Sequence, residues 1–286
     1  MITLRNLTFS YRKQSRPALL NVNATIGPGI HLLVGENGAG KTTLLHIMAG
    51  LLHPSEGECL VDRHPAASTV PAQMGHIFFL EENAAFPAKT ILDFASADSG
   101  FYPSFSMERF LANLAEFGLT GNEHLRKQSL GNRKKAQLAY VLALGVDTLL
   151  LDEPTNGLDI SAKRAFRKAV AKNMTDEKCI IISTHQVLDV EKILDHVCII
   201  DNNGVLLNTS MFEVSKHLSF RVTNDRELIE NALMSFDAPG GASIVERATP
   251  DNETDVNLEM LFEFVESNRD LVKQIFSDAN AASPLF

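Results

Sequence analysis

The chain has 286 residues, of which 45% are apolar and 21% are charged, and its formal net charge is −9. This length and apolar share allow a large buried core, which excludes a predominantly disordered chain. The net negative charge argues against a protein that coats nucleic acid, because neutralising phosphates requires clustered cations.

The negative charge is concentrated near the C-terminus. Residues 218–286 contain 13 acidic and 5 basic residues, which leaves residues 1–217 close to neutral. This change in composition predicts a main domain over residues 1–217 and an acidic accessory unit over residues 218–286.

The sequence also indicates a compartment. Cys59, Cys179 and Cys198 have no paired or metal-binding spacing, which fits a reducing cytosol. The first residues lack the apolar core of an export signal, and no run approaches the roughly 18 apolar residues of a membrane span. We therefore expect a cytoplasmic protein, for which a separate chain would supply any membrane-spanning part.

The apolar pattern of the N-terminal residues predicts strands followed by a helix. Residues 2–9 and 20–26 alternate apolar and polar side chains, as half-buried strands do. Residues 30–34 form the nearly continuous apolar run of a buried parallel strand. A glycine-rich loop at residues 35–40 follows, and a helix is expected from Lys41.

The rest of the chain alternates helices and strands. Residues 88–128 should be mostly helical; the next expected helices are residues 133–144, 162–174 and 187–194, and the expected strands are residues 148–151, 179–183 and 197–200. This alternation predicts an α/β sheet with parallel crossovers. The acidic unit should be β-α-β-α, with strands at 220–222 and 243–245 and helices at 227–234 and 258–276.

Residues 35–42 match the phosphate-binding pattern G-x-x-x-x-G-K-[ST], between the strand and the helix that it requires. The glycines let backbone N–H groups converge on phosphate oxygens, and the helix N-terminus adds positive potential. Lys41 can reach the β- and γ-phosphates, and the Thr42 hydroxyl can ligate Mg²⁺. The alternative is a glycine-rich turn without a ligand, which the flanking strand and helix disfavour.

Two carboxylates, Asp152 and Glu153, end the apolar strand at residues 148–151. Parallel α/β sheets bind ligands at that edge, so Asp152 suits a Mg²⁺-holding role and Glu153 could polarise an attacking water. His185 follows the next apolar strand and could contact the γ-phosphate or that water. On position alone, the acids could be solvated side chains and His185 a structural hydrogen-bonding group.

In this order and spacing, the motifs resemble the nucleotide-binding subunits of ATP-binding cassette (ABC) transporters, over about residues 1–215. The resemblance implies an α/β P-loop NTPase fold with a mainly parallel sheet, an N-terminal antiparallel β subdomain and an inserted α-helical subdomain at about residues 88–132. The acidic residues 218–286 would form a small C-terminal α+β appendage.

The resemblance also assigns site residues. Those that would contact ATP are Tyr11, Gly35, Asn37, Gly38, Ala39, Gly40, Lys41, Thr42 and Thr43, with Tyr11 stacking on the adenine. Glu153 and His185 would be the catalytic pair, with His185 as the family's switch histidine. Asp159 matches a loop that contacts a second subunit, and it could also cap the following helix.

Residues 128–132, Gln-Ser-Leu-Gly-Asn, occupy the place of the family signature, which reaches the ATP held by the other subunit. Ser129, Gly131 and Asn132 would make this contact in trans, and Leu130 replaces the first glycine of the signature. Without the resemblance, a serine before a helix is a simple N-cap.

A second departure concerns a glutamine that the family carries shortly before a Phe-Pro pair. Counting back from Phe86 and Pro87 places Glu81 there. A carboxylate can still ligate Mg²⁺, but it adds negative charge beside a triphosphate. The alternative is a solvated loop acid.

Basic residues surround the signature. Arg126, Lys127, Arg133, Lys134 and Lys135 are spaced as a solvated helix face would be, so we expect no nucleic-acid partner.

The resemblance implies an ATPase subunit that uses ATP and Mg²⁺ to power a membrane transporter. It would lie on the cytoplasmic face through a permease on a separate chain, and it would pair with a copy of itself or with a paralogue. Residues 101–105 and the acidic unit resemble bacterial exporter-type subunits. The alternative, motivated by Leu130 and Glu81, is a regulatory subunit that responds to ATP but hydrolyses it weakly.

Overall fold

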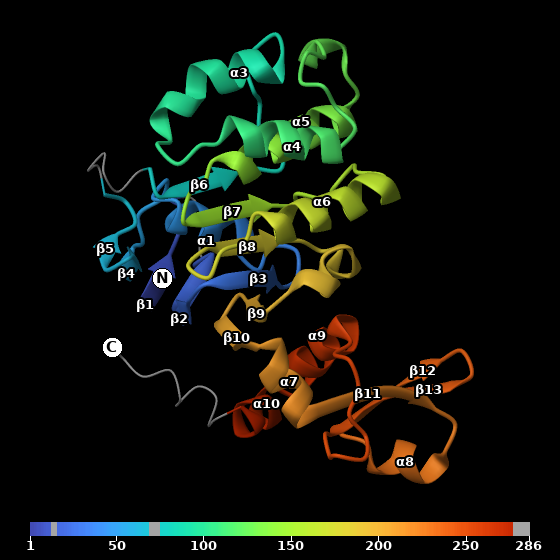
Figure 1. The fold of residues 1–286 in the computed structure, drawn as a ribbon. Coiled ribbons are helices and arrows are strands. Elements are labelled where there is room, and N and C mark those ends of the chain that lie inside the picture. The colour runs from blue at the N-terminus through green and yellow to red at the C-terminus, as the bar shows by residue number, and fades with distance from the viewer. Residues whose placement is uncertain (13–15, 69–74, 277–286) are drawn as a thin grey trace.

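A computed structural model describes residues 1–12, 16–68 and 75–276 of the chain (Figure 1). The chain forms a mainly parallel central sheet, an antiparallel N-terminal sheet, a layer of helices and a C-terminal α+β unit. This arrangement confirms the predicted α/β fold class.

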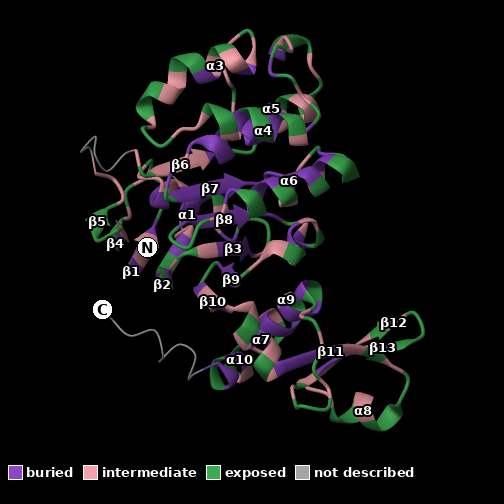
Figure 2. Cartoon of the chain, in the orientation of Figure 1, coloured by how far each residue is buried: buried purple, intermediate pink, exposed green. Residues whose placement is uncertain are grey.

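The central sheet has the strand order β10-β9-β3-β8-β7-β6. Its strands are β3 (Gly29–Val34), β6 (Ile77–Leu80), β7 (Thr148–Asp152), β8 (Cys179–Ser183), β9 (His196–Asp201) and β10 (Gly204–Ser210). Neighbours run parallel except β10, which is antiparallel to β9. Both β7 and β8 are buried along their whole length (Figure 2), which explains why their sequences are almost continuously apolar.

The N-terminal sheet has the order β2-β1-β4-β5, with every pair antiparallel. Its strands are β1 (Ile2–Phe9), β2 (Leu19–Ile26), β4 (Glu56–Val61) and β5 (His64–Pro65). Buried β1 residues such as Ile2 and Leu4 share one apolar cluster with Leu44 and Leu45 of α1 (Lys41–Met48). This sheet is the predicted antiparallel subdomain, and it supports the helix that follows the glycine-rich loop.

A layer of helices covers the β6 end of the central sheet (Figure 1). It contains α3 (Ile91–Asp98), α4 (Met107–Glu116) and α5 (Leu130–Ala143). Thr90, Ser106 and Ser129 cap these helices, each accepting the backbone N–H three residues later. Tyr140 of α5 is fully buried and donates its hydroxyl to Asp98 at 2.7 Å, which joins α5 to α3.

The helix predicted at residues 187–194 is wrong. After β7 and α6 (Ile160–Lys172), the chain passes through β8 and then makes only two 3₁₀ turns, Val187–Asp189 and Glu191–Ile193. The chain then starts β9 at His196. Asp195, the residue before it, is anchored to β3 because its side chain accepts the Ile30 N–H at 2.8 Å. This short, anchored connection favours tight turns over a regular helix.

The C-terminal unit starts with β11 (Leu218–Thr223), directly after α7 (Met211–His217). Its antiparallel sheet has the order β11-β13-β12, with β12 (Met234–Ala238) and β13 (Gly241–Arg247), and its helices are α8 (Arg226–Asn231), α9 (Leu258–Ser267) and α10 (Arg269–Ile275).

Two of the predicted helices in this unit are wrong in extent. The helix expected at residues 227–234 ends at Asn231, and Met234 already belongs to strand β12. Alternate β12 residues are half-buried and exposed, and pairing with β13 overrides the helical tendency of the sequence. The helix expected at residues 258–276 is broken at Asn268, whose φ of −128° is not helical.

The C-terminal unit packs under β9 and β10 (Figure 1). Phe264 and Phe276 belong to the same apolar cluster as Val197 of β9, and Arg269 forms a 2.6 Å ion pair with Asp201 at the end of that strand. The unit is therefore continuous with the core. In the described part of the chain, no helix has the length and apolar character needed to cross a bilayer.

A pair of histidines lies inside the central sheet. His31 of β3 is 3% exposed, and its ring stacks on that of His196 of β9 with the centroids 4.5 Å apart. Burial and the neighbouring His196 lower the pKa of His31 to about 4, although a hydrogen bond to Gly27 and the charge of Asp195 act in the opposite direction. His31 is therefore neutral in the folded chain at neutral pH.

We predict that acid destabilises the fold through His31. The ordinary pKa of 6.5 lies above the folded value of about 4, so between these values the unfolded chain binds a proton that the folded chain does not. From pH 7 to pH 5 this should cost about 2 kcal/mol in the free energy of unfolding. Urea unfolding measures it: His31→Gln should lose this share of the pH dependence, and the exposed His53→Gln should keep it. Equal pH dependence in the parental chain and His31→Gln would contradict the assignment.

Candidate functional site

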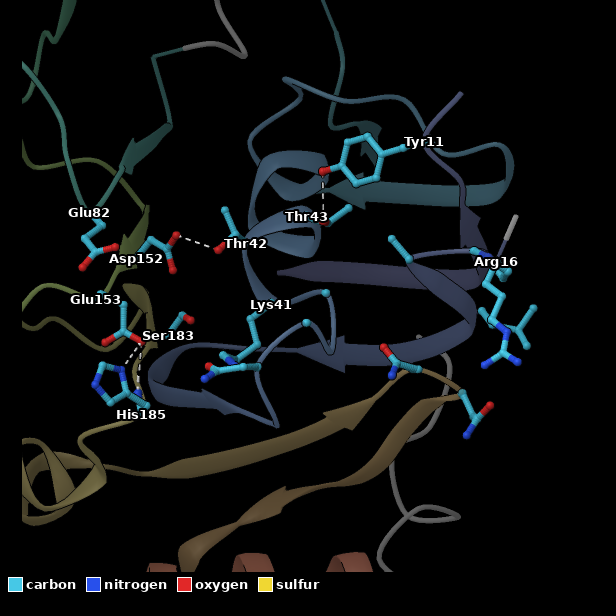
Figure 3. Close-up of a pocket in the computed structure, with 18 of the residues that line it drawn as sticks. Tyr11, Arg16, Lys41, Thr42, Thr43, Glu82, Asp152, Glu153, Ser183 and His185 are labelled. Carbon is cyan, nitrogen blue, oxygen red and sulfur yellow. Dashed lines mark hydrogen bonds and ion pairs between the residues drawn. The ribbon is translucent and has the colours of Figure 1, made fainter. Parts of the chain in front are cut away.

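A cavity of about 1150 Å³ opens at the carboxyl ends of the parallel strands β3, β7 and β8 (Figure 3). It is lined by Tyr11, Arg16, Pro17, Ala18, Leu20, Asn37, Gly38, Gly40, Lys41, Thr42, Thr43, Glu82, Asp152, Glu153, Asn156, Ser183, His185, Asn202 and Asn203. The structure thus brings together residues predicted from four separate segments of the sequence. A cavity of this size accommodates a nucleotide-sized ligand.

The glycine-rich loop shapes one wall of this cavity. A side chain at Gly35 would collide with the Ile200 carbonyl oxygen, and Gly40 has a φ of +93°, which favours glycine. Lys41 folds over the loop and donates to the carbonyl oxygens of Gly35 at 2.6 Å and Glu36 at 3.0 Å. The lysine therefore sits inside the loop, where phosphate oxygens can replace the carbonyls as its acceptors.

Burial lowers the pKa of Lys41, while the carboxylates of Glu153 and Asp152 partly offset this effect. Burial likewise raises the pKa of Asp152, and the nearby charges of Glu153 and Glu82 add to the rise. The cavity is thus a region where charges are costly unless they are paired.

Thr42 and Asp152, the residues predicted to hold Mg²⁺, are in direct contact. The Thr42 hydroxyl donates to Asp152 Oδ2 at 2.8 Å, so one hydroxyl and one carboxylate converge on one point (Figure 3). Among the described residues, no group of three or more His, Cys, Asp or Glu side chains could hold a metal by itself. A hydroxyl and a carboxylate oxygen are ligand types that Mg²⁺ accepts, and Mg²⁺ usually binds a protein through one or two oxygens and fills its shell with water and phosphate oxygens.

Glu153 and His185 are in direct contact (Figure 3). Glu153 Oε1 lies 2.8 Å from His185 Nδ1 and accepts the His185 backbone N–H at 3.1 Å, and Thr184 donates to Oε2 at 2.9 Å. Glu153 also has a φ of +47°, a left-handed conformation that is unusual for a residue with a side chain. This turn aims the carboxylate across the end of β8, and strained backbone of this kind is common at functional sites.

Tyr11 lies at the far end of the cavity from Glu153 (Figure 3). Its hydroxyl is 3.0 Å from Thr43 Oγ1, and its ring is 39% exposed. An exposed ring can stack on a base, as the sequence resemblance implies. The sequence analysis did not identify Arg16, Asn202 and Asn203, which come from loops without a motif of their own.

The structure places Glu82, and not Glu81, at the cavity. The side chain of Glu81 lies 3.2 Å from His46 Nε2 outside the lining, whereas Glu82 accepts the Asn156 side-chain amide at 2.7 Å. Leu80 pairs with Leu151 in the sheet, and this register determines which of the two acids turns inward. Counting residues back from Phe86 and Pro87 could not reveal this register. Because Glu81 does not line the cavity, its position does not support the predicted metal role.

The signature residues lie outside this cavity. Ser129 caps α5, accepting the Asn132 N–H at 3.2 Å, and a side chain at Gly131 would lie 3.0 Å from the Gly157 carbonyl oxygen. Asp159 caps α6, and hydrogen bonds from Ser161 and from the Ala162 N–H lower its pKa to about 2. The signature and the loop that precedes Asp159 are therefore neighbours.

One part of the basic cluster corrects the sequence analysis. Lys134 is 4% exposed, so it does not belong to a solvated helix face, and its ammonium donates to the Glu153 carbonyl oxygen at 2.6 Å. Ala136 to Ala143 are all buried, so α5 is enclosed on every side over this stretch, and Lys134 lies just before it. No amphipathic pattern in the sequence marked Lys134 as a buried position.

Comparison with known proteins identifies relatives. The sequence model of the ABC transporter family matches residues 19–156. A putative ABC transporter ATP-binding protein of Pyrococcus furiosus is 31% identical over 74% of this chain and 85% of the relative. The ABC transporter ATP-binding protein NatA of Bacillus subtilis is 32% identical over 72% and 88%. A solved dimeric ATP-binding cassette in a post-hydrolysis state, bound to ADP and Pi, has a TM-score of 0.63 at 24% identity, over 73% of this chain and 98% of that one.

We predict that Lys41→Ala weakens ATP binding by roughly 10- to 100-fold, because a hydrogen bond to a charged group contributes about 1.5–3 kcal/mol. Titration with a fluorescent ATP analogue measures the affinity. Lys168→Ala is the control, since Lys168 pairs with Glu116 on the surface and does not line the cavity. Unchanged affinity in Lys41→Ala would show that the loop does not hold the phosphates.

Proposed function

Since this chain belongs to the ATP-binding subunits of ABC transporters, we propose that it binds and hydrolyses ATP in the described cavity to power a membrane-spanning partner. One observation carries the proposal. Lys41, the Thr42–Asp152 pair and the Glu153–His185 pair line a single cavity at the ends of parallel strands. These are the groups that phosphoryl transfer to water requires.

Each group has a defined role in this proposal. The loop N–H groups and Lys41 hold the triphosphate, and Tyr11 stacks on the base. Thr42 and Asp152 would hold Mg²⁺, which would supply charge neutralisation on the phosphates. Glu153 accepts a proton from the attacking water, and His185 orients that carboxylate and the γ-phosphate. The contacts of Thr184 and His185 with Glu153 fix both of its oxygens before substrate arrives.

A second subunit completes the site in this proposal. Ser129, Gly131 and Asn132 contact the ATP of the partner subunit, and Asp159 meets the partner's loop. The two helix starts that carry these residues also expose apolar side chains, with Leu130 60% and Ile160 88% exposed. Large apolar side chains exposed on one face favour burial against another chain.

The closing and opening of this dimer would move the permease, a separate membrane-spanning chain, so the protein would lie at the cytoplasmic face of the membrane through that partner. The permease would determine what is transported. Residues 1–217 carry every group of this mechanism, and we assign the acidic unit from residue 218 an accessory role.

We predict that Glu153→Gln lowers the rate of ATP hydrolysis by about 10²–10⁴-fold, because it removes a positioned base. ATP affinity should stay close to parental, since the triphosphate is held by the opposite wall of the cavity. Phosphate release and nucleotide titration measure the two quantities. Hydrolysis at the parental rate would exclude Glu153 as the base.

We predict that Glu153→Gln with Mg-ATP shifts from monomer to dimer in light scattering, because ATP trapped between two subunits is not hydrolysed. The same variant with Mg-ADP should stay monomeric, since the bridging γ-phosphate is missing. ATP that binds without any shift would instead favour the alternative function, a weakly hydrolysing regulatory subunit that pairs with a paralogue.

A further inference from the structure

Lys134 is a buried ammonium group next to the catalytic turn. It lies on α5, five residues after Ser129, and it is 4% exposed. Its Nζ donates to the Glu153 carbonyl oxygen at 2.6 Å, and that oxygen also accepts the Asn156 N–H at 3.3 Å. A lysine is rarely buried to this degree without paired charge, so its surroundings must offset a large desolvation cost.

Three carboxylates provide that offset. Burial lowers the pKa of Lys134, and the charges of Glu82, Glu153 and Asp152 act in the opposite direction, with Glu82 contributing most. Glu153 and Asp152 act in the same way on Lys41. Three acids of the nucleotide cavity therefore act on two ammonium groups, Lys41 within the cavity and Lys134 on the signature helix beside it.

Glu82 links the two sides of this arrangement. It lines the nucleotide cavity, and with Lys134 it also lines a second cavity of about 600 Å³ on the side of the helical layer. Among the described residues, its only hydrogen bond comes from the neutral Asn156 amide. A triphosphate bound in this cavity would be repelled by the Glu82 carboxylate, and a nearby cation reduces that repulsion.

We propose that Lys134 is a positioning residue for ATP hydrolysis, which balances the charge of Glu82 beside the triphosphate and ties the Glu153 turn to the helix that carries Ser129. The inference rests on the proposed ATPase function. Because one ammonium group serves both tasks, movement of α5 on contact with a second subunit is transmitted to the backbone of Glu153 through a single hydrogen bond.

A double-mutant cycle tests the proposal with the full chain. The variants are Lys134→Gln, Glu82→Gln and the double variant, with Lys168→Gln as a surface lysine control. For each variant, the affinity for a fluorescent ATP analogue, the kcat and KM of hydrolysis and the melting temperature are measured. Affinity is also measured without Mg²⁺, so that the readout does not depend on turnover.

Lys134→Gln should weaken ATP affinity by roughly tenfold or more in the parental background, because it leaves Glu82 uncompensated. In the Glu82→Gln background the same substitution should cost less than about threefold, because the repulsive charge is gone. Lys134→Arg, which keeps the charge, should retain ATP affinity within about threefold while lowering kcat, since the guanidinium cannot reproduce the same contact with Glu153.

An equal cost of Lys134→Gln in both backgrounds would overturn the proposal, because a merely structural lysine does not depend on Glu82. If Lys134→Gln does not fold, the double variant must fold, because removing the Glu82 charge relieves the defect; a double variant that also fails to fold overturns the proposal. A parental chain that neither binds nor hydrolyses ATP would instead refute the proposed function, which keeps the two failures distinct.

Discussion

The nucleotide site depends on the parallel pairing of β3, β8 and β7. In this register Leu33 pairs with Ser183, and Ser183 pairs with Asp152, so the phosphate loop, the carboxylates and His185 all leave the sheet at the same edge. Both β7 and β8 are completely buried, and a shift of one residue would require turning their side chains to the opposite faces. The apolar core therefore fixes the relative positions of groups that lie more than a hundred residues apart in the sequence.

Placing these groups at one edge has an electrostatic cost. Glu82, Asp152 and Glu153 all line the cavity, whose size suits a nucleotide, and burial raises the pKa of Asp152. Lys41 and Lys134 supply the opposing charge from two different elements. Catalysis through electrostatic preorganisation depends on such fixed charges.

The site is also connected to the rest of the molecule on two sides. Lys134 connects it to α5 and the signature, and Asp201 connects it to the C-terminal unit. Asp201 accepts from Asn203, which lines the cavity, and pairs with Arg269 of α10. The signature helix and the acidic unit are thus both linked to the nucleotide site by direct polar contacts, which could transmit a change at that site to either element.

The sequence alone determined the phosphate loop, the carboxylates after β7, the histidine after β8 and the α/β class, because each is encoded by neighbouring residues and a local apolar pattern. Only the tertiary structure decided that Glu82 enters the cavity in place of Glu81, that Lys134 is buried, that Met234 starts a strand and that residues 187–194 form no regular helix. These features depend on strand register and on packing between distant segments. A short stretch of sequence contains only one side of each of these contacts, so it cannot predict them.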